Sequence, residues 1–458
     1  MKEESEMPFA FSPSGNENDD EKNSQESCLS KNKKLIIFIV VGALLVTAII
    51  VSIIIILSKG KDKDKNKDNS KQESEIKTNS TNFIKAVYNI TKISESSKIY
   101  NAFTLPPNYY NMSELISSII IDDKNIAVDP QSGTYQFEKK GIYTVEIYFK
   151  KDLHYIEGFF MYCTNVIEVD FTNFTTTELD SMSSLFKGCI NLKKIVYGDK
   201  FNTEKLNHMD EVFALCESLE EIDLTKYETK NVFSMNSLFQ GCKNLKKIIF
   251  GNFNTKRVEE MRNMFNGCSS LKSIDLSKFD TSKVSNFEYM FAGCSSLITI
   301  DTKFIYTNSS IDMSGMFEKC TNLVLLDLNH FDTSQAKDMT TMFSDCTNLQ
   351  SLNLKGFNTE GVFSMEEMFM NCKSLISLDL SSFNTPNLKD VDRLFSGCSS
   401  LKELNIPKFN TTLVQEASEI FNEVPEGGKI TYDSSIFTTN IINNIPKNWN
   451  ITDIKEKK

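Results

Sequence analysis

The sequence predicts an α/β repeat solenoid of about ten coils with a parallel strand ladder, preceded by a small mostly-β module and one transmembrane helix. Three observations predict this architecture. Ten of the eleven cysteines recur with eight gaps of 26 residues and one of 27. Apolar residues recur in step with these cysteines, and residues 35–57 contain no charged side chain. A fixed period of 20–50 residues is typical of solenoids, because each unit buries its apolar side only against its neighbours.

The first element is the uncharged segment 35–57, whose 23 residues would span roughly 35 Å as a helix and therefore cross a bilayer. The flanking lysines slightly favour a cytoplasmic C-terminal side, whereas long domains cross membranes largely regardless of charge. We expect residues 1–34 to be a polar cytoplasmic tail. Cys28 in this tail is a candidate for S-palmitoylation, with a free thiol as the alternative.

Two further segments separate this helix from the repeats. Residues 58–82 have alternating charges and no apolar periodicity, which predicts a solvated flexible linker. Residues 83–151 are predicted to form a small β module that also serves as an N-terminal cap. In its run 135–149 the alternation continues on both sides of Gly141, which predicts a strand–turn–strand unit. Tyr143, Val145, Ile147 and Phe149 would share one face of the second strand.

The repeat occupies residues 152–424, and the coil around Cys268 shows its plan. Val258, Met261 and Met264 precede the cysteine at the spacing of one helical stripe, which predicts a short helix in each coil. Ile274 and Leu276 follow it with the alternation of a strand. The dipeptide Asp280-Thr281 is expected to cap the next helix. Stacked coils would therefore carry strands on one side and short helices on the other.

The phrase from Met261 to Thr281, M-x-x-M-F-x-G-C-x-x-L-x-x-I-D-L-S-x-F-D-T, resembles the repeat of BspA-type leucine-rich repeat surface proteins of bacteria and protists. The resemblance covers about residues 152–424 and implies a leucine-rich repeat solenoid that acts in adhesion to cells or matrix. One departure is the Phe that stands where leucine-rich repeats usually carry Asn, as at Phe279 and Phe331. Backbone groups of that turn are therefore expected to bond to the Asx-Thr pair that follows.

The ten repeat cysteines are predicted to form a structural column of buried free thiols. Clustered C-x-x-C ligands are absent, which argues against zinc. Disulfides between adjacent coils are the alternative, although parallel side chains would hold the Cβ atoms too far apart. The column comprises Cys163, Cys189, Cys216, Cys242, Cys268, Cys294, Cys320, Cys346, Cys372 and Cys398.

Outward residues of the strand ladder supply the candidate binding face. Seven positions after the cysteine, most coils carry Asp or Asn, and stacked carboxylates would favour a cation or a basic partner. The alternative is a solvated Asx row that only stabilises the turn. The row comprises Asp170, Asp223, Asp275, Asp301, Asp327, Asn353, Asp379 and Asn405.

Composition and motifs exclude several function classes. A net charge of −11 argues against a nucleic-acid partner, because phosphate contacts need a basic face. The chain has only three histidines and no phosphate loop, H-E-x-x-H or G-x-S-x-G motif. We therefore expect no enzyme activity, no cofactor and no metal.

The remaining expectations concern glycosylation and the end of the chain. Residues 425–458 leave the repeat and are predicted to form a C-terminal cap with a terminal strand, in which Trp449 packs on the last repeats. Sequons for N-glycosylation follow the predicted membrane helix at Asn79, Asn89, Asn111, Asn173, Asn308, Asn410 and Asn450.

Together these features predict a single-pass cell-membrane protein whose repeat domain is extracellular. The implied function is non-covalent binding of a protein or glycan on another surface, as in adhesion. Two alternatives remain open at this stage: a receptor that signals through a membrane partner or a tail-binding adaptor, and a structural or antigenic coat protein.

Overall fold

The computed structural model describes residues 81–93, 96–102, 112–126 and 132–455, all within a compact unit that extends from Lys77 to Lys458. Several predicted features lie outside these residues: the tail 1–34, the helix 35–57, most of the linker 58–82, and Cys28, Asn79 and Asn111. In the described part of the chain, none of the helices combines the length and apolarity that crossing a bilayer requires.

The first described region is mostly β, as the alternation predicts. Its elements are β1 (Phe83–Ile90), β2 (Ser97–Lys98), α2 (Met112–Leu115), β3 (Ile116–Ile121), β4 (Lys124–Asn125), β5 (Thr134–Tyr135) and β6 (Gly141–Phe149). The larger sheet has the order β4-β3-β6-β1-β7-β8, in which β7 (Val166–Asp170) and β8 (Lys194–Val196) are the first strands of the solenoid. Because β1 pairs antiparallel with β7, this region shares one sheet with the repeats and covers their first coil.

The predicted strand–turn–strand unit around Gly141 is wrong, although the predicted face of its second strand is confirmed. β5 pairs with β2 in a separate two-stranded sheet, whereas β6 lies between β3 and β1. The long apolar strand β1 offers β6 eight paired positions, more than the short run before Gly141 can offer. Val145, Ile147 and Phe149 are buried on one face of β6.

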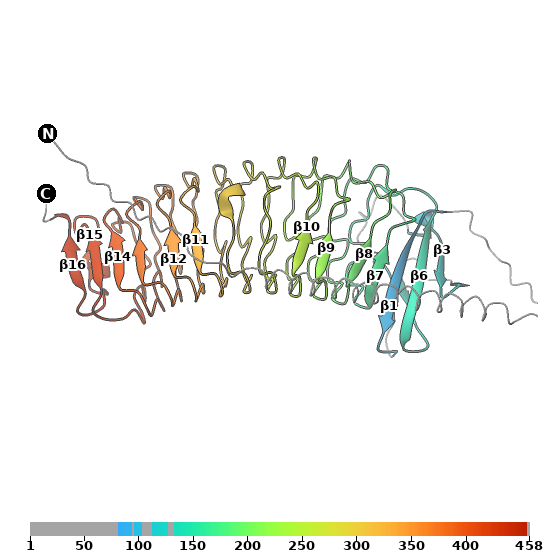
Figure 1. Ribbon diagram of the computed structural model, residues 1–458, viewed down its shortest axis with the longest axis horizontal. Helices are drawn as coiled ribbons and strands as arrows, with labels where there is room; N and C mark the ends of the chain where they lie inside the picture. The colour runs from blue at the N-terminus through green and yellow to red at the C-terminus, as the bar shows by residue number, and fades with distance from the viewer. Residues whose placement is uncertain (1–80, 94–95, 103–111, 127–131, 456–458) are drawn as a thin grey trace, which may run out of the picture. The chain divides into compact units, whose positions relative to one another are not determined.

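The solenoid stacks its coils so that their short strands lie in one row (Figure 1). After β7 and β8 these strands are β9 (Glu221–Asp223), β10 (Lys247–Ile249), β11 (Leu325–Asp327), β12 (Ser351–Asn353), β13 (Ser377–Asp379) and β14 (Glu403–Ile406). Their mutual pairing is parallel, as predicted, with β9 to β10 and β11 to β12 in register at the 26-residue period. The coils of Cys268 and Cys294 lack an assigned strand, and their bond from Ile298 N to Lys272 O is stretched to 3.5 Å.

The predicted helices are wrong. Residues 152–424, all of them described, contain no α-helix and a single 3-10 turn, η1 (Thr302–Phe304). Two residues per coil, five and one before the cysteine, have positive φ, for example Asn263 at 57° and Gly267 at 75°. Left-handed residues interrupt a right-handed helix. Alternate N–H groups also donate to the next coil, as from Phe265 to Met290 O at 2.9 Å, instead of bonding along a helix.

These inter-coil bonds make the turn side the continuous support of the solenoid. At each of the ten steps from the Cys163 coil onward, four backbone N–H groups donate to carbonyl oxygens of the next coil. In the coil of Cys268 the donors are Met261, Asn263, Phe265 and Gly267. The strand side is joined less regularly, because its ladder divides into separate sheets.

Two buried columns fill the interior and hold successive coils together. Eleven phenylalanines from Phe160 to Phe421 stack with ring centroids 5.4–6.0 Å apart. Ten buried threonines from Thr176 to Thr411 donate to backbone carbonyls of the next coil. Turn groups therefore do bond to a threonine of an Asx-Thr pair, but to the one in the preceding coil, as Asp280 does to Thr255, rather than to the pair that follows in their own coil.

The C-terminal region continues the ladder as well as closing it. β15 (Lys429–Tyr432) pairs parallel with β14, and β16 (Asn450–Asp453) pairs with β15. The short helix α3 (Thr439–Ile442) lies between them in the chain. Trp449 is 7% exposed and its Nε1 donates to Pro425 O at 2.8 Å, so it packs where the last repeat ends, as predicted.

Amide hydrogen exchange is expected to be slower on the turn side of the central coils than on their strand side. Amides of Asn263, Phe265 and Gly267 should exchange at least tenfold more slowly than those of Ser273 to Asp275, because only the former donate to a neighbouring coil. Mass spectrometry of peptides from these segments measures the difference. Equal protection of the two segments would contradict the turn-side support.

Candidate functional site

The predicted Asx row lies along one margin of the strand face, which we define as the outward residues four, five and seven positions after each cysteine. Asp223, Asp275, Asp301, Asp327 and Asp379 are exposed there, and the other members are partly buried. Each carboxylate or amide oxygen from Asp170 to Asp379 accepts the N–H of the residue two positions later, at 2.7–3.3 Å. The row therefore stabilises the turn that follows each strand, which is the second role that the sequence left open.

Asn405 is the exception in this row, and its neighbour explains it. Pro407 stands two residues later and has no N–H to donate. The Asn405 amide instead donates to Asp379 Oδ1 at 2.9 Å. The row is thus linked from coil to coil at its C-terminal end.

Two carboxylates of this row, those of Asp275 and Asp301, have a lowered pKa and are therefore charged at neutral pH. The bond from Ser277 lowers the pKa of Asp275, and Lys303 lowers that of Asp301. In the described residues no group of three or more Asp, Glu, His or Cys is arranged to hold a metal ion.

Outward residues on the turn side form a second acidic surface that the sequence interpretation missed. We define the turn face as the outward residues eight and six positions before each cysteine. Burial, followed by neighbouring carboxylates, raises the pKa of Glu260 and Glu366. The signal was present in the sequence, because aligning the coils on the cysteine places many Asp and Glu in these two columns.

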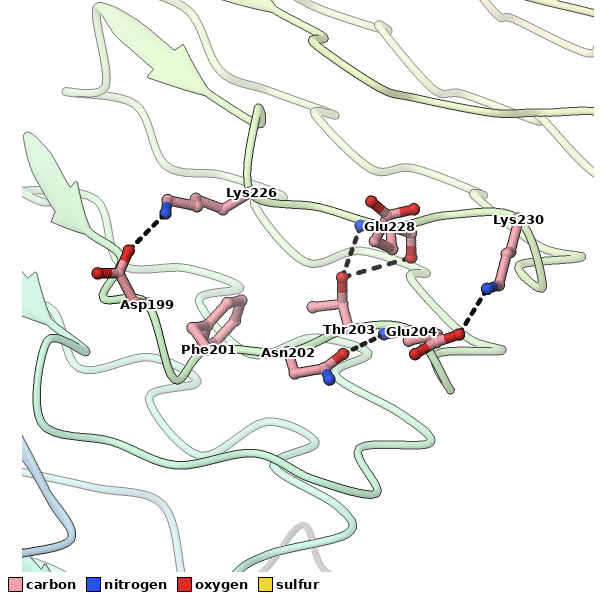
Figure 2. A pocket seen from close by; sticks show the side chains of 8 residues that line it. All are labelled: Asp199, Phe201, Asn202, Thr203, Glu204, Lys226, Glu228 and Lys230. Atoms are coloured by element: carbon pink, nitrogen blue, oxygen red, sulfur yellow. Dashed lines mark hydrogen bonds and ion pairs between the residues drawn. The ribbon is translucent and has the colours of Figure 1, made fainter.

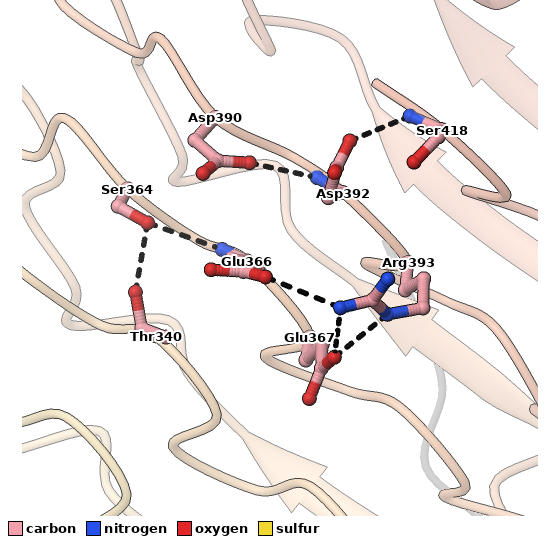
Figure 3. A network of polar contacts seen from close by, with 8 residues as sticks. All are labelled: Thr340, Ser364, Glu366, Glu367, Asp390, Asp392, Arg393 and Ser418. Carbon is pink, nitrogen blue, oxygen red and sulfur yellow. Dashed lines mark hydrogen bonds and ion pairs between the residues drawn. The ribbon is translucent and has the colours of Figure 1, made fainter. Parts of the chain in front are cut away.

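Figure 3 shows that hydrogen bonds and one arginine hold this turn face in place. Arg393 donates from Nε to Glu367 at 2.7 Å and from Nη2 to Glu366 at 3.3 Å. Asp392 accepts the N–H of Ser418 from the next coil at 2.6 Å. These contacts engage the carboxylates within the solenoid, so they support the stacking of the coils.

A shallow groove of about 450 Å³ lies beside Asp199 and Phe201, within the 27-residue gap (Figure 2). Its lysines are already paired, Lys226 with Asp199 at 2.8 Å and Lys230 with Glu204 at 2.7 Å. The Thr203 hydroxyl, a member of the threonine column, accepts the N–H of Glu228 at its floor. A ligand here would have to displace these pairs, so the groove is a poorer candidate than the strand face.

The predicted column of free thiols is present. All ten repeat cysteines are free and buried, and nine of them donate from Sγ to a phenylalanine carbonyl of the preceding coil at 3.0–3.3 Å. Burial raises the pKa of Cys242, Cys294, Cys346 and Cys398 to about 12. These thiols are protonated and unreactive at neutral pH, so they serve packing rather than chemistry.

The described sequons differ in accessibility. Asn89, Asn173, Asn308 and Asn450 are exposed. Asn410 is partly buried, and its Oδ1 accepts both the N–H and the hydroxyl of Thr412 at 2.9 and 2.7 Å. Glycosylation of any of them stays a prediction, with Asn410 the least accessible.

The fold and its surfaces define a repeat solenoid whose inward groups serve the stack and whose outward groups differ from coil to coil. Three overlapping matches to one family model cover residues 154–250, 216–323 and 311–434, more than half of the chain. The chain therefore belongs to the family described as Mycoplasma protein of unknown function, DUF285. No curated protein matches it.

Two solved structures are similar at 16% sequence identity. A leucine-rich repeat protein from Bacteroides ovatus aligns over 70% of this chain and 90% of its own length, with a TM-score of 0.28. The TLR13–ssRNA13 complex aligns over 59% of this chain and 47% of its own, with a TM-score of 0.23. The chain thus spans about half the length of the second structure.

Proposed function

We propose that this protein is a non-catalytic binding protein whose solenoid recognises a protein or glycan on another cell or on the surrounding matrix. The observation that carries the proposal is that each coil combines constant inward residues with variable outward residues. Inward phenylalanine, cysteine and threonine side chains repeat almost unchanged, whereas the outward strand-face positions vary from Lys and Glu to Ile and Ser. A rigid support with a variable exposed face is how solenoids present extended binding surfaces.

The finer proposal is that this solenoid stands on the outside of the cell, anchored by residues 35–57. The uncharged stretch and the lysine-rich residues 58–82 after it support this arrangement. The resemblance of the repeat to BspA-type leucine-rich repeat surface proteins supports adhesion as the role. Nothing in this role requires the short N-terminal tail to carry an enzymatic domain.

The test is binding of the purified full-length chain, held in detergent, to cultured cells and to immobilised matrix proteins. We expect saturable binding that heat-unfolded protein lacks. Failure of the native protein to bind more than the unfolded protein on every surface would oppose adhesion and favour a passive coat. Deleting residues 1–34 should leave this binding unchanged, since the strand face is intact.

The strand face is expected to carry the binding, and its carboxylates offer a direct variant. Replacing Asp275, Asp301 and Asp327 with Ser retains a turn-forming oxygen but removes three charges, and we expect at least a tenfold weaker Kd for the same surface. The matched control replaces the turn-face carboxylates Glu260, Glu288 and Glu366 with Gln. If binding is unchanged in the Ser variant, the acidic row has no part in recognition.

A further inference from the structure

At the positions four and five residues after each cysteine, the strand face has a charged part and an uncharged part. In the first coils its lysines and glutamates form ion pairs between neighbouring coils, such as Lys194 with Glu168 at 2.8 Å and Lys247 with Glu221 at 2.7 Å. Long side chains paired in this way neutralise one another and present little apolar surface. This part is therefore suited to remaining in solvent.

The uncharged part covers four successive coils, and we call it the central apolar segment. It comprises the residues four and five positions after the cysteine, of which Ile298, Val324, Leu325 and Ile376 are apolar and Thr299, Gln350, Ser351 and Ser377 are polar but uncharged. The side chains of Ile298, Leu325 and Ile376 are 53%, 58% and 59% exposed. Backbone bonds from Val324 to Ile298 at 3.3 Å and from Gln350 to Val324 at 2.9 Å join the first three coils, and the bond from Phe343 to Met368 at 3.0 Å joins the fourth on the turn side.

Exposed aliphatic side chains gathered on one face mark interaction sites more often than scattered ones do. Lys272 and Lys402 stand at the two ends of the segment, in the same column as Ile298 and Ile376. These lysines are five coil steps or about 24 Å apart at a coil spacing of about 4.8 Å, and the column between them is uncharged. That length is enough for several residues of an extended or helical partner segment.

A margin of carboxylates runs beside the central apolar segment and determines which partner fits. On β11, Leu325 and Asp327 point to the same exposed face, two residues or about 6.6 Å apart. Asp301 pairs with Lys303, whereas Asp327 and Asp379 have no ion pair in the described part of the chain. Two carboxylates without an ion pair beside an apolar strip complement a partner that carries apolar and basic side chains together.

We infer that the central apolar segment and its carboxylate margin dock a protein segment that presents aliphatic or aromatic side chains flanked by Lys or Arg. This inference rests on the proposed binding function and names the class of partner. The apolar side chains supply the contact that excludes water, and Asp327 and Asp379 select the basic flank. A glycan partner would lack the apolar side chains that this strip requires.

The experiment uses the full-length chain and four fluorescent twelve-residue peptides, built from Leu with Lys, Leu with Glu, Ser with Lys, and Ser with Glu. We expect the Leu/Lys peptide to bind at least tenfold more tightly than each of the other three. Equal binding of the Leu/Lys and Leu/Glu peptides would overturn the role of the margin. Equal binding of the Leu/Lys and Ser/Lys peptides would overturn the role of the apolar segment.

Two matched variants locate the site. Replacing Ile298, Leu325 and Ile376 with Ser should weaken Leu/Lys binding at least tenfold. The control variant replaces Phe233, Ile311 and Phe363 with Ser. These side chains are exposed on the turn side, so the control should bind the peptide like the parent protein. Loss in the control alone would place the site elsewhere and refute the inference. A dimer of the parent that the Ser variant lacks, seen by light scattering, would show that a second copy is the occupant instead.

Cell adhesion measured in parallel separates this inference from the proposed function. If the protein binds no cell or matrix surface but binds the Leu/Lys peptide selectively, the result contradicts the adhesion function and supports the docking site. If adhesion is strong and is unchanged in the variant of Ile298, Leu325 and Ile376, the result contradicts the docking site and supports the adhesion function.

Discussion

Between pH 8.5 and 10 the protein is expected to lose stability steeply, because its ten buried thiols keep their protons only in the folded state. Burial raises their pKa, to about 12 for Cys294 and Cys346, whereas a thiol of the unfolded chain ionises near pH 8.5. The stabilisation is fully present below about pH 8.5 and is lost as the pH rises toward the folded pKa. Each thiol then lowers the free energy of unfolding by about 1.4 kcal/mol per pH unit.

Urea unfolding under reducing, oxygen-free conditions at half-unit steps of pH measures this slope. Replacing Cys294 and Cys346 with Ala should reduce the slope between pH 9 and 10 by about 2.7 kcal/mol per pH unit, the contribution of two thiols. The control replaces the buried Met290 and Met342 with Ala, which removes packing but no thiol, and its slope should match the parent. An unchanged slope in the cysteine variant would show that those thiols do not keep their protons on folding.

Replacing Thr333 with Val is expected to lower the free energy of unfolding by about 2–5 kcal/mol. The Thr333 hydroxyl donates to Asn358 O at 2.7 Å and accepts the Asn358 N–H at 2.8 Å, and Thr333 is fully buried. Valine has nearly the same shape but leaves both backbone groups of Asn358 without a partner. Urea unfolding monitored by circular dichroism measures the loss.

The matched control is Thr333→Ser, which keeps the hydroxyl and loses one methyl group, at a cost of about 1 kcal/mol. The threonine column predicts that the Ser variant is clearly more stable than the Val variant. The reverse order would mean that packing of the methyl group, rather than the double hydrogen bond, holds the coils together at this position. In seven of the ten threonines the hydroxyl bonds to both backbone groups of a single residue, so the result should extend along the solenoid.

The period, the buried columns and the strand register could be predicted from the sequence, because each depends on inward residues that repeat every 26 positions. The helices could not, because an i, i+3, i+4 stripe also arises from consecutive turns. The discriminating signal was the residue before the cysteine, which is Gly in five coils and Asn or Asp in two, such as Gly267 and Asn371. These residue types favour positive φ and break a helix.

The candidate site was predicted in part. The Asx row was found at its expected place, yet its bonds to the following turn depend on the backbone geometry of each coil and could not be derived from spacing alone. The turn face was missed because the segment before each cysteine was interpreted only as the inward stripe of a short helix. The central apolar segment was missed because it lies three and two positions before the Asp column, at residues such as Val324 and Leu325, whose types change from coil to coil.

The central claim is that the solenoid is a binding surface exposed outside the cell, and trypsin treatment of intact cells that make the full-length chain tests it most directly. Lysines between residues 59 and 77 precede the solenoid. We predict that brief digestion releases a folded fragment containing the repeats into the medium, while residues 1–34 stay with the cells. Protection of residues 58–458 in intact cells, with cleavage only after lysis, would contradict the account.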